Sequence, residues 1–297
     1  MLGKRLINTG SVACTTDTVQ ILDPGSTQSV ALYRFEDNAN DTAYTAGTTV
    51  SSNKIIDLDV NGYSSGSTIS NSASNTDDAT IVGNVTYSNP SGSNGRFDLD
   101  GNADYLEING NVTFNGAANF TIEGWFKPDN ITYLDHLFTI WDGGTNSRFY
   151  LRFANASGDL DAYTYTTAGG TSANVVSSNT AARVQANVFN HVVMTYTDGG
   201  SGKIAVYVNG VLGGSATPSA AINTTGTAPL LVGVLGNGQQ GNYDFDGEVG
   251  QVRFYTSALS ATEVLQNYNA TRALYAANHG TADSNVTYST GKFGKAA

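Results

Sequence analysis

The sequence predicts an all-β fold of antiparallel strands with one short helix near the C-terminus, and three observations lead to that prediction. Charged residues make up only 13% of the 297 residues, against a usual share of about 25%, so polarity comes mostly from Gly, Ser, Thr, Asn and Asp. Most segments alternate apolar and polar residues with period two, as strands with one buried face do. Between them stand turns such as WDGGTN and TDGGSGK, where Gly adopts a positive φ at little cost.

Six segments show the alternation clearly, and each is predicted to be a strand. They are YLEI (105–108), FTIEGWF (120–126), RFYLRF (148–153), HVVMTY (191–196), KIAVYVNG (203–210) and VGQVRFY (249–255). The stretch TYTDGGSGKIAVYVNG is expected to form a hairpin.

Residues 260–274, SATEVLQNYNATRAL, form the segment with helical character. Ser260 is a good N-cap, and Glu263 stands three residues later, where it completes a capping box. Val264, Leu265 and Tyr268 share one face of such a helix. We therefore expect one short helix after the last strand.

The length predicts either about two domains or one large β domain, and the motif order favours one sandwich with two terminal segments. The expected parts are an N-terminal arm (1–27), a sandwich (28–274) and a C-terminal tail with an orphan strand (275–297). Within the sandwich, residues 42–80 are rich in Thr, Ser, Asn and Gly around KIIDLDV. That segment is predicted to be a surface insertion with a strand inside it.

Charge and cysteine content exclude several classes of function. The formal net charge of −11 repels phosphate backbones and anionic lipids, which argues against nucleic-acid binding and membrane-surface roles. The single cysteine, Cys14, excludes an intrachain disulfide framework. Apolar runs are too short for a membrane span, and the first residues lack the apolar core of a signal peptide, so we expect a soluble chain without membrane insertion.

An internal repeat is the most unusual feature of the chain, because NVTYS occurs at 84–88 and again at 285–289. The second copy lies in the tail without the strands of a further domain. It could pack on its own sandwich or remain as duplication debris; alternatively, it could add to the sheet of a neighbouring copy. In the second case assembly would use Leu6, Ile7 and four tail residues, Asn285, Val286, Thr287 and Tyr288.

The order of these motifs carries a family resemblance over about residues 29–272. The run VALYRFEDNANDT, NVTYS, GRFDLDGNADYLEI, FTIEGWFKPD, HVVMTYTDGGSGKIAVYVNG and YDFDGEVGQVRFYTSALSATEV resembles the laminin-G-like, concanavalin-A-like jelly-roll domains. The resemblance implies an antiparallel two-sheet sandwich with a short helix after its last strand. With the tail, the chain also resembles structural proteins of bacteriophage particles. Family members often carry an Asp-Glu pair where this chain has Gly250 and Gln251, and a Trp where it has Phe189.

Catalysis is not expected from the acidic residues. Related sugar-cleaving enzymes carry a Glu-x-Asp-x-x-Glu strand that places two carboxylates on one face, and none of the five Glu residues stands in such an arrangement. Asp244, Asp246 and Glu248 alternate around a Gly turn, where solvated carboxylates are the ordinary explanation. His191 is expected to be structural.

Calcium is the one cofactor that the sequence suggests. DLDGNAD places Asp98, Asp100, Asn102 and Asp104 at alternate positions around Gly101, and carboxylate and amide oxygens are the ligands that Ca²⁺ prefers. Asp246 is a further candidate. The alternative is a turn in which Asp and Asn bond the local backbone.

Glycan binding is the second activity considered, because exposed aromatic faces beside Asn, Asp and Gly loops suit sugars. Trp141, followed by Asp142, is the Trp nearest a loop. The sequence thus predicts a non-enzymatic virion protein (decoration, appendage or fibre), found in the virion or outside cells after release. Its expected partners are copies of itself and other virion proteins, and the alternative is a calcium-dependent adhesin for cell-surface glycans.

Overall fold

The computed structural model describes residues 18–22, 29–34, 48–74, 76–90, 94–108, 119–198, 202–236 and 243–275. The chain divides into two compact units, Ala46–Ala277 and the combination of Met1–Thr45 with Asn278–Ala297. In the second unit β1 (Thr18–Leu22) pairs antiparallel with β2 (Ser29–Arg34). The predicted sandwich started at residue 28, and the observed division lies instead after Thr45. The predicted assembly residues, Leu6, Ile7 and Asn285 to Tyr288, lie outside the described residues.

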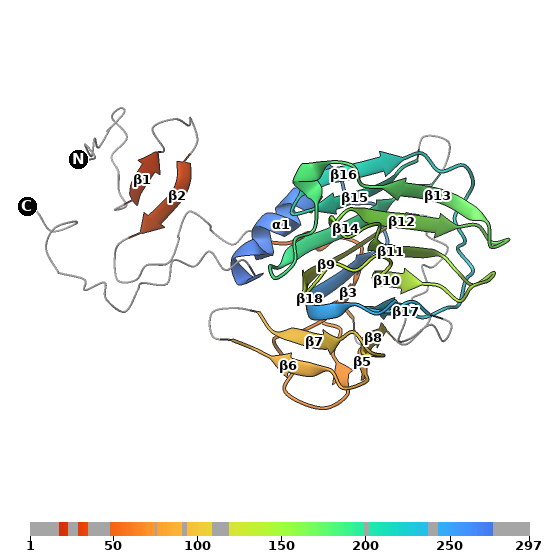
Figure 1. Ribbon diagram of the computed structural model, residues 1–297, viewed down its shortest axis with the longest axis horizontal. Coiled ribbons are helices and arrows are strands. Elements are labelled where there is room, and N and C mark those ends of the chain that lie inside the picture. The colour runs from red at the N-terminus through yellow and green to blue at the C-terminus, as the bar shows by residue number, and fades with distance from the viewer. Residues whose placement is uncertain are drawn as a thin grey trace, which may run out of the picture. The chain divides into compact units, whose positions relative to one another are not determined.

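The larger unit is a sandwich of two antiparallel sheets, which confirms the predicted fold class (Figure 1). The front sheet runs in the order β13 (Thr171–Val176), β12 (Leu160–Tyr165), β11 (Phe149–Phe153), β10 (His136–Ile140), β17 (Leu230–Val232), β8 (Tyr105–Ile108), β5 (Ala79–Val82) and β4 (Thr68–Ile69). The back sheet runs in the order β16 (Val211–Ala216), β15 (Ile204–Val208), β14 (Asn190–Tyr196), β9 (Phe120–Pro128), β18 (Asp246–Tyr255), β7 (Arg96–Asp100) and β6 (Thr86–Ser88), with β3 (Lys54–Asp57) also paired to β18.

All six predicted strands are present, and the expected hairpin is formed by β14 and β15. Their apolar positions fill the space between the sheets. Phe120 of β9 stacks on Phe149 of β11 with ring centroids 4.9 Å apart, and both side chains are fully buried. Alternation along each strand therefore sets which face enters the core.

The segment 42–80 is not a surface insertion, although it does contain a strand. Its described part supplies β3 to the back sheet and β4 and β5 to the front sheet. Ile56, Leu58 and Val60 are at most 2% exposed in the core. The polar composition of this segment reflects its loops and short strands. Its few apolar residues are sufficient to anchor the segment in the core.

The predicted helix is α1 (Ala261–Tyr275), which packs on the outer face of the back sheet (Figure 1). Its capping box is formed, since Ser260 Oγ accepts from the Glu263 N–H at 3.3 Å and Glu263 Oε2 accepts from the Ser260 N–H at 2.8 Å. Leu259 and Val264 pack against Val193 and Tyr255 of the sheet. No helix within the described ranges is long and apolar enough to cross a membrane.

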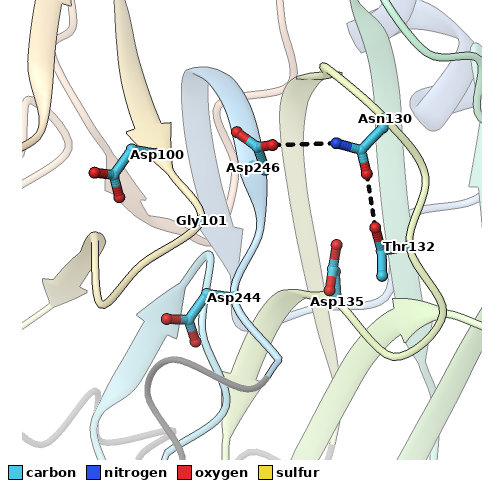
Figure 2. Close-up of a pocket in the computed structure, with 7 residues that line it drawn as sticks. All are labelled: Asp100, Gly101, Asn130, Thr132, Asp135, Asp244 and Asp246. Atoms are coloured by element: carbon cyan, nitrogen blue, oxygen red, sulfur yellow. Dashed lines mark hydrogen bonds between the residues drawn. The ribbon is translucent and has the colours of Figure 1, made fainter.

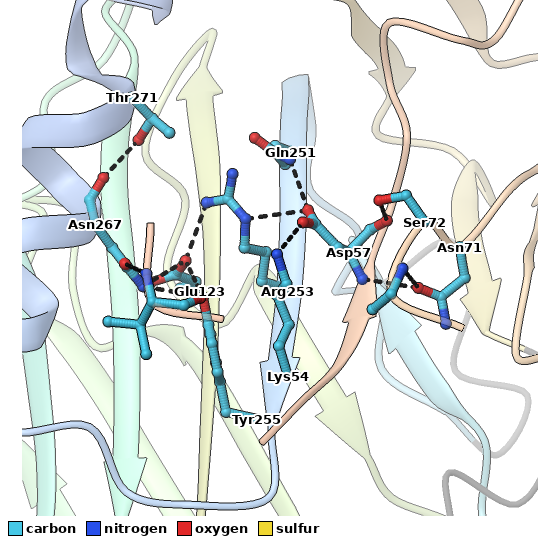
Figure 3. A network of polar contacts seen from close by, with 12 residues as sticks. Lys54, Asp57, Asn71, Ser72, Glu123, Gln251, Arg253, Tyr255, Asn267 and Thr271 are labelled. Atoms are coloured by element: carbon cyan, nitrogen blue, oxygen red, sulfur yellow. Dashed lines mark hydrogen bonds and ion pairs between the residues drawn. The ribbon is translucent and has the colours of Figure 1, made fainter. Parts of the chain in front are cut away.

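A buried polar network fixes α1 to the sheet, with Glu123 of β9 at its centre (Figure 3). Glu123 Oε1 accepts from Arg253 Nη1 at 3.1 Å, and both its oxygens accept from Asn267 Nδ2 of the helix. Arg253 Nε also donates to Asp57 Oδ1 at 3.0 Å, which ties in β3. His191 Nε2 lies 3.4 Å from Glu123 Oε2, so this histidine belongs to the structural network, as expected.

The departure at Gly250 has a steric reason. A Cβ at Gly250 would lie 2.4 Å from Tyr275 Cε1, so only glycine leaves room for this ring. Tyr275 also stacks on Trp125, with ring centroids 4.8 Å apart, and its hydroxyl accepts from the Gln251 N–H at 2.8 Å. Phe189 contributes to the same cluster, 5.0 Å from the Tyr275 ring. The positions that differ from the family pattern thus serve to seat the end of α1.

Candidate functional site

An open, acidic pocket of about 240 Å³ lies where β7 ends and β18 begins (Figure 2). We call it the acidic pocket, and its lining residues are Asp100, Gly101, Asn130, Thr132, Asp135, Asp244 and Asp246. Asp246, the first residue of β18, pairs with Asp100, the last residue of β7. The loop between β9 and β10 supplies Asn130, Thr132 and Asp135, so segments distant in the sequence converge on one hollow.

The backbone at the pocket allows this close approach. Gly101 has φ +72°, and a Cβ there would lie 3.0 Å from the Cβ of Asp246, so a larger residue would be strained in conformation and crowded. Across the pocket, Asn130 Nδ2 donates to Asp246 Oδ2 at 3.1 Å, and Thr132 Oγ1 donates to Asn130 Oδ1 at 2.6 Å. These bonds hold one carboxylate and one amide in fixed orientations.

Two carboxyl groups of the pocket, those of Asp135 and Asp246, have raised pKa values. Burial, reinforced by the charges of Asp244 and Asp246, raises the pKa of Asp135 to about 7, although a bond from Thr132 opposes the rise. Burial and the neighbouring Asp129 and Asp100 also raise the pKa of Asp246. The pocket therefore presents strong acceptors together with one carboxyl that can carry a proton near neutral pH.

The five residues predicted to bind calcium do not act as one group. Asp100 and Asp246 line the acidic pocket, but Asp104 is fully buried and accepts from the Asn84 N–H at 2.6 Å and the Asp100 N–H at 3.2 Å. The Asn102 N–H donates to Asp100 Oδ1 at 2.9 Å, which is the local turn bonding considered as the alternative. Asp98 stands on β7 beside Asp100 and pairs across with Glu248 of β18.

Within the described ranges, no three His, Cys, Asp or Glu residues form a group that could hold a metal ion. The oxygen donors around the pocket are of the kind that Ca²⁺ prefers. Calcium binding by Asp98, Asp100, Asn102, Asp104 and Asp246 stays a prediction.

Four pocket residues were missed as site candidates by the sequence reasoning: Asn130, Thr132, Asp135 and Asp244. Asp244 was noted as part of an alternating acidic run and interpreted as solvated, but it is 6% exposed, and its Oδ2 accepts from the Ala103 N–H at 2.6 Å. No local signal marked Asp135, which is 7% exposed just before β10. In the same loop the Tyr133 side chain is 60% exposed.

The two residues predicted as a sugar platform lie away from the acidic pocket, at the other end of β10. The half-buried Trp141 hydrogen-bonds the hydroxyl of Tyr165 on β12. Asp142 organises its own loop, accepting from the Gly144 N–H at 2.8 Å and Asn146 Nδ2 at 2.7 Å. Burial alone would raise the pKa of Asp142, but these bonds outweigh it and lower that pKa. Ligand binding by Trp141 and Asp142 stays a prediction.

Two antiparallel sheets enclosing one core, with a helix on the back sheet, define a jelly-roll sandwich domain. A family model described as the concanavalin A-like lectin/glucanases superfamily matches residues 100–265. The chain belongs to this superfamily, as its motif order predicted. Comparison with curated proteins finds no match.

Several solved structures share the fold at low sequence identity. Domain 4 of AbnA, a GH43 extracellular arabinanase from Geobacillus stearothermophilus in complex with arabinotriose, is similar with a TM-score of 0.55 and 17% identity, over 72% of this chain and 98% of that one. The binding domain of Paraclostridial Mosquitocidal Protein 1 is similar with a TM-score of 0.58 and 16% identity, over 74% of this chain. The receptor binding domain of botulinum neurotoxin type G has a TM-score of 0.53 and 17% identity, over 73% of this chain. The match spans 52% and 51% of those two toxin chains.

Proposed function

We propose that the sandwich is a non-enzymatic carbohydrate-binding domain, and that the acidic pocket receives a hydroxyl-rich group of the glycan. The observation that carries this proposal is the pocket itself, an open hollow with four carboxyl groups, an amide and a hydroxyl. Sugar hydroxyls donate hydrogen bonds, and carboxylates accept them strongly. The exposed ring of Tyr133 supplies an apolar face of the kind on which a sugar can stack.

The relatives support a binding role. One similar structure is a domain complexed with arabinotriose, and others are named as binding or receptor binding domains. The acidic lining would repel uronate, sialate or sulfate groups. An uncharged, hydroxyl-rich glycan is therefore the ligand class that the pocket fits.

Binding without cleavage is proposed from the residues that line the pocket. All its carboxyl groups come from Asp, and the alternating Glu-x-Asp-x-x-Glu strand of related sugar-cleaving enzymes is missing from the sequence. Incubation with neutral polysaccharides followed by product analysis tests this part. Release of oligosaccharides that is lost in Asp135→Asn would show catalysis and overturn the non-enzymatic proposal.

The binding proposal is tested on an array of neutral and anionic glycans, followed by calorimetry on the best hit. Asp246→Asn and Asp100→Asn should each weaken binding at least tenfold, because each removes a charged acceptor from the pocket. Asp77→Asn is a matched control, since Asp77 is a half-buried aspartate in the 71–78 loop, which does not line the pocket. No binding to any glycan would contradict the proposal.

Calcium is retained as part of this proposal, with Asp100 and Asp246 as the predicted ligands that line the pocket. Calorimetry with CaCl₂ and glycan binding with and without chelator test it. If the glycan affinity is unchanged in chelator and titration with CaCl₂ releases no heat of binding, the domain binds glycans without calcium and the calcium part of the proposal is wrong.

A virion structural role, with self-association through the termini, is the second function that we propose. It is supported by one observation linking sequence and fold: the first copy of the repeat contains β6, an edge strand of the back sheet, and edge strands are ready templates for a further strand. Light scattering of the full chain and of a variant lacking residues 276–297 tests it. Equal assembly of both would contradict strand donation.

A further inference from the structure

The outer faces of the two sheets differ in what they carry. Helix α1 packs on the back sheet, whereas no helix within the described ranges packs on the front sheet. The outer positions of β11, β12 and β13 in the front sheet hold a polar and aromatic group that we call the tyrosine face. Its members are Tyr150, Arg152, Asp161, Tyr163, Tyr165 and Asn174.

Strand register brings these side chains into two rows. Tyr150 of β11 pairs with Tyr163 of β12, which in turn pairs with Asn174 of β13. The Tyr150 and Tyr163 rings lie 4.8 Å apart, and the Tyr165 ring lies 5.9 Å from that of Tyr150. Because residues two apart on a strand share a face, Tyr163 and Tyr165 both contribute to it. Both are half-buried, and Asn174 is exposed.

The second row is an ion pair laid over the aromatic rings. The Arg152 guanidinium lies 4.6 Å from the ring centroid of Tyr150 and 5.7 Å from that of Tyr163. Its Nε and Nη2 donate to Asp161 Oδ2 at 3.0 and 2.9 Å. The arginine and aspartate charges cancel, so the tyrosine face has fixed donors, fixed acceptors and ring surfaces but no net charge.

Ring contacts of the buried His136 connect the tyrosine face with residues next to the acidic pocket. His136, next to the pocket residue Asp135, has its ring 5.3 Å from Tyr150 and 6.0 Å from Tyr243, which precedes the pocket residue Asp244. Burial, together with the charge of Arg152, lowers the pKa of His136 to about 3, so this bridging ring is uncharged at neutral pH. The path from β10 to β13 crosses three strand spacings, or about 14 Å.

We infer that the ligand is a linear, uncharged oligosaccharide that enters the acidic pocket with one unit and lies across the tyrosine face with the following units. This inference rests on the proposed function and adds the ligand class and a second contact surface. The occupant follows from the lack of net charge on the face, from its ring surfaces and from its connection through His136 to residues next to the pocket. A single sugar would contact the pocket alone, whereas a longer chain would also contact Tyr163 and Arg152.

The experiment is calorimetry of the full chain with neutral fragments of arabinan, xylan, mannan and cellulose. Each kind of fragment is tested as a series from monosaccharide to hexasaccharide, and oligogalacturonates serve as the charged comparison. Affinity should rise with length in one neutral series. Tyr163→Ala should lower affinity for the longest member about tenfold and leave monosaccharide affinity unchanged. Asp246→Asn should weaken both, because both use the pocket.

Tyr63→Ala is the matched control, since Tyr63 is also half-buried in an aromatic cluster, 5.1 Å from the ring of Phe97, away from the tyrosine face. Thermal unfolding verifies that each variant is folded, and Tyr163→Phe, which keeps the ring, should retain the affinity if Tyr163→Ala unfolds. Glycan binding without length dependence, or a Tyr163→Ala variant with wild-type affinity, would overturn this inference and leave the proposed function standing. Preference for oligogalacturonates would overturn the ligand class, and no binding in any series would overturn both proposals.

Discussion

Replacing Glu123 should destabilise the sandwich strongly, because this buried carboxylate joins α1 to three strands of the back sheet. Glu123 is 1% exposed and lies within bonding distance of Arg253, Asn267, Tyr255 and His191. Glu123→Ala leaves the buried Arg253 with Asp57 as its remaining acidic partner. Removing one partner of a buried pair costs about 3–5 kcal/mol, so we expect a loss of about 4 kcal/mol, or roughly 10 °C in Tm for a domain of this size.

The pH dependence of the free energy of unfolding in acid offers an independent measure of the contribution of Glu123. Burial alone would raise the Glu123 pKa, but the bonds and charges of His191, Arg253 and Asn267 lower it from 4.5 to about 2. The folded state therefore binds this proton more weakly than the unfolded state. Stabilisation is complete above about pH 4.5 and is lost as the pH falls toward 2, a contribution of roughly 3 kcal/mol.

Urea denaturation of wild type, Glu123→Ala and Glu123→Gln between pH 2.5 and 7 tests both statements. Glu123→Gln should lose about half as much as Glu123→Ala at pH 7 and should show a flatter profile below pH 4.5. Glu107→Ala is the control, a half-buried glutamate on β8 of the front sheet, with an expected loss within about 0.5 kcal/mol. A loss under about 1 kcal/mol for Glu123→Ala would refute the role assigned to the network.

Three further substitutions follow from the geometry. The raised pKa of Asp135 favours its protonated form, so its ionisation lowers the free energy of unfolding as the pH rises from about 4 to 7. The Tm of Asp135→Asn should therefore lie a few degrees above that of wild type at pH 8 and equal it at pH 4. Equal Tm values at pH 8 would contradict the assigned charge repulsion. Gly250→Asp should displace the Tyr275 ring and lower the free energy of unfolding by about 1–3 kcal/mol. In a double-mutant cycle with Tyr275→Ala, the two losses of stability should be less than additive. Additive losses would contradict direct contact between the two positions. Asp104→Ala removes the acceptor of two backbone N–H groups and should lower the free energy of unfolding by about 2 kcal/mol or more. The resulting fall in Tm should be the same in CaCl₂ and in chelator. A fall in Tm that occurs only in CaCl₂ would show that Asp104 binds the metal.

Local patterns were sufficient for the fold because its elements are encoded locally. Period-two alternation marked β9 and β14, and the pair Ser260 and Glu263 marked the start of α1. Alternation could not reveal what covers an outer face, however. Glu123 and Trp125 stand at outer positions of β9, where solvent would be expected, and α1 buries both.

The acidic pocket could not be predicted because it depends on pairings between distant segments. Ala103 and Asp244, joined by a hydrogen bond, are 141 residues apart, and Asp135 reaches them from a third loop. The sequence did mark the acidic turn 98–104 as unusual. It could not show that Asp104 turns inward to bond the backbone while Asp100 lines the acidic pocket, because register and loop path decide the direction of each side chain.

The pKa values of Glu123 and Asp135 are shifted in opposite directions, so their charged forms have opposite effects on the stability of the fold. This contrast distinguishes a structural carboxylate from one in a candidate binding site. The cationic and hydrogen-bonding partners of Glu123 lower its pKa, so its charged form stabilises the fold. Burial and two like charges raise the pKa of Asp135, so its charged form opposes the fold. A group that costs stability in an open hollow is typical of a site shaped by a ligand. An uncharged, hydroxyl-rich ligand would relieve that cost by donating hydrogen bonds to the carboxylates, which is why the acidic pocket, and not the larger Glu123 network, is the place where we expect binding.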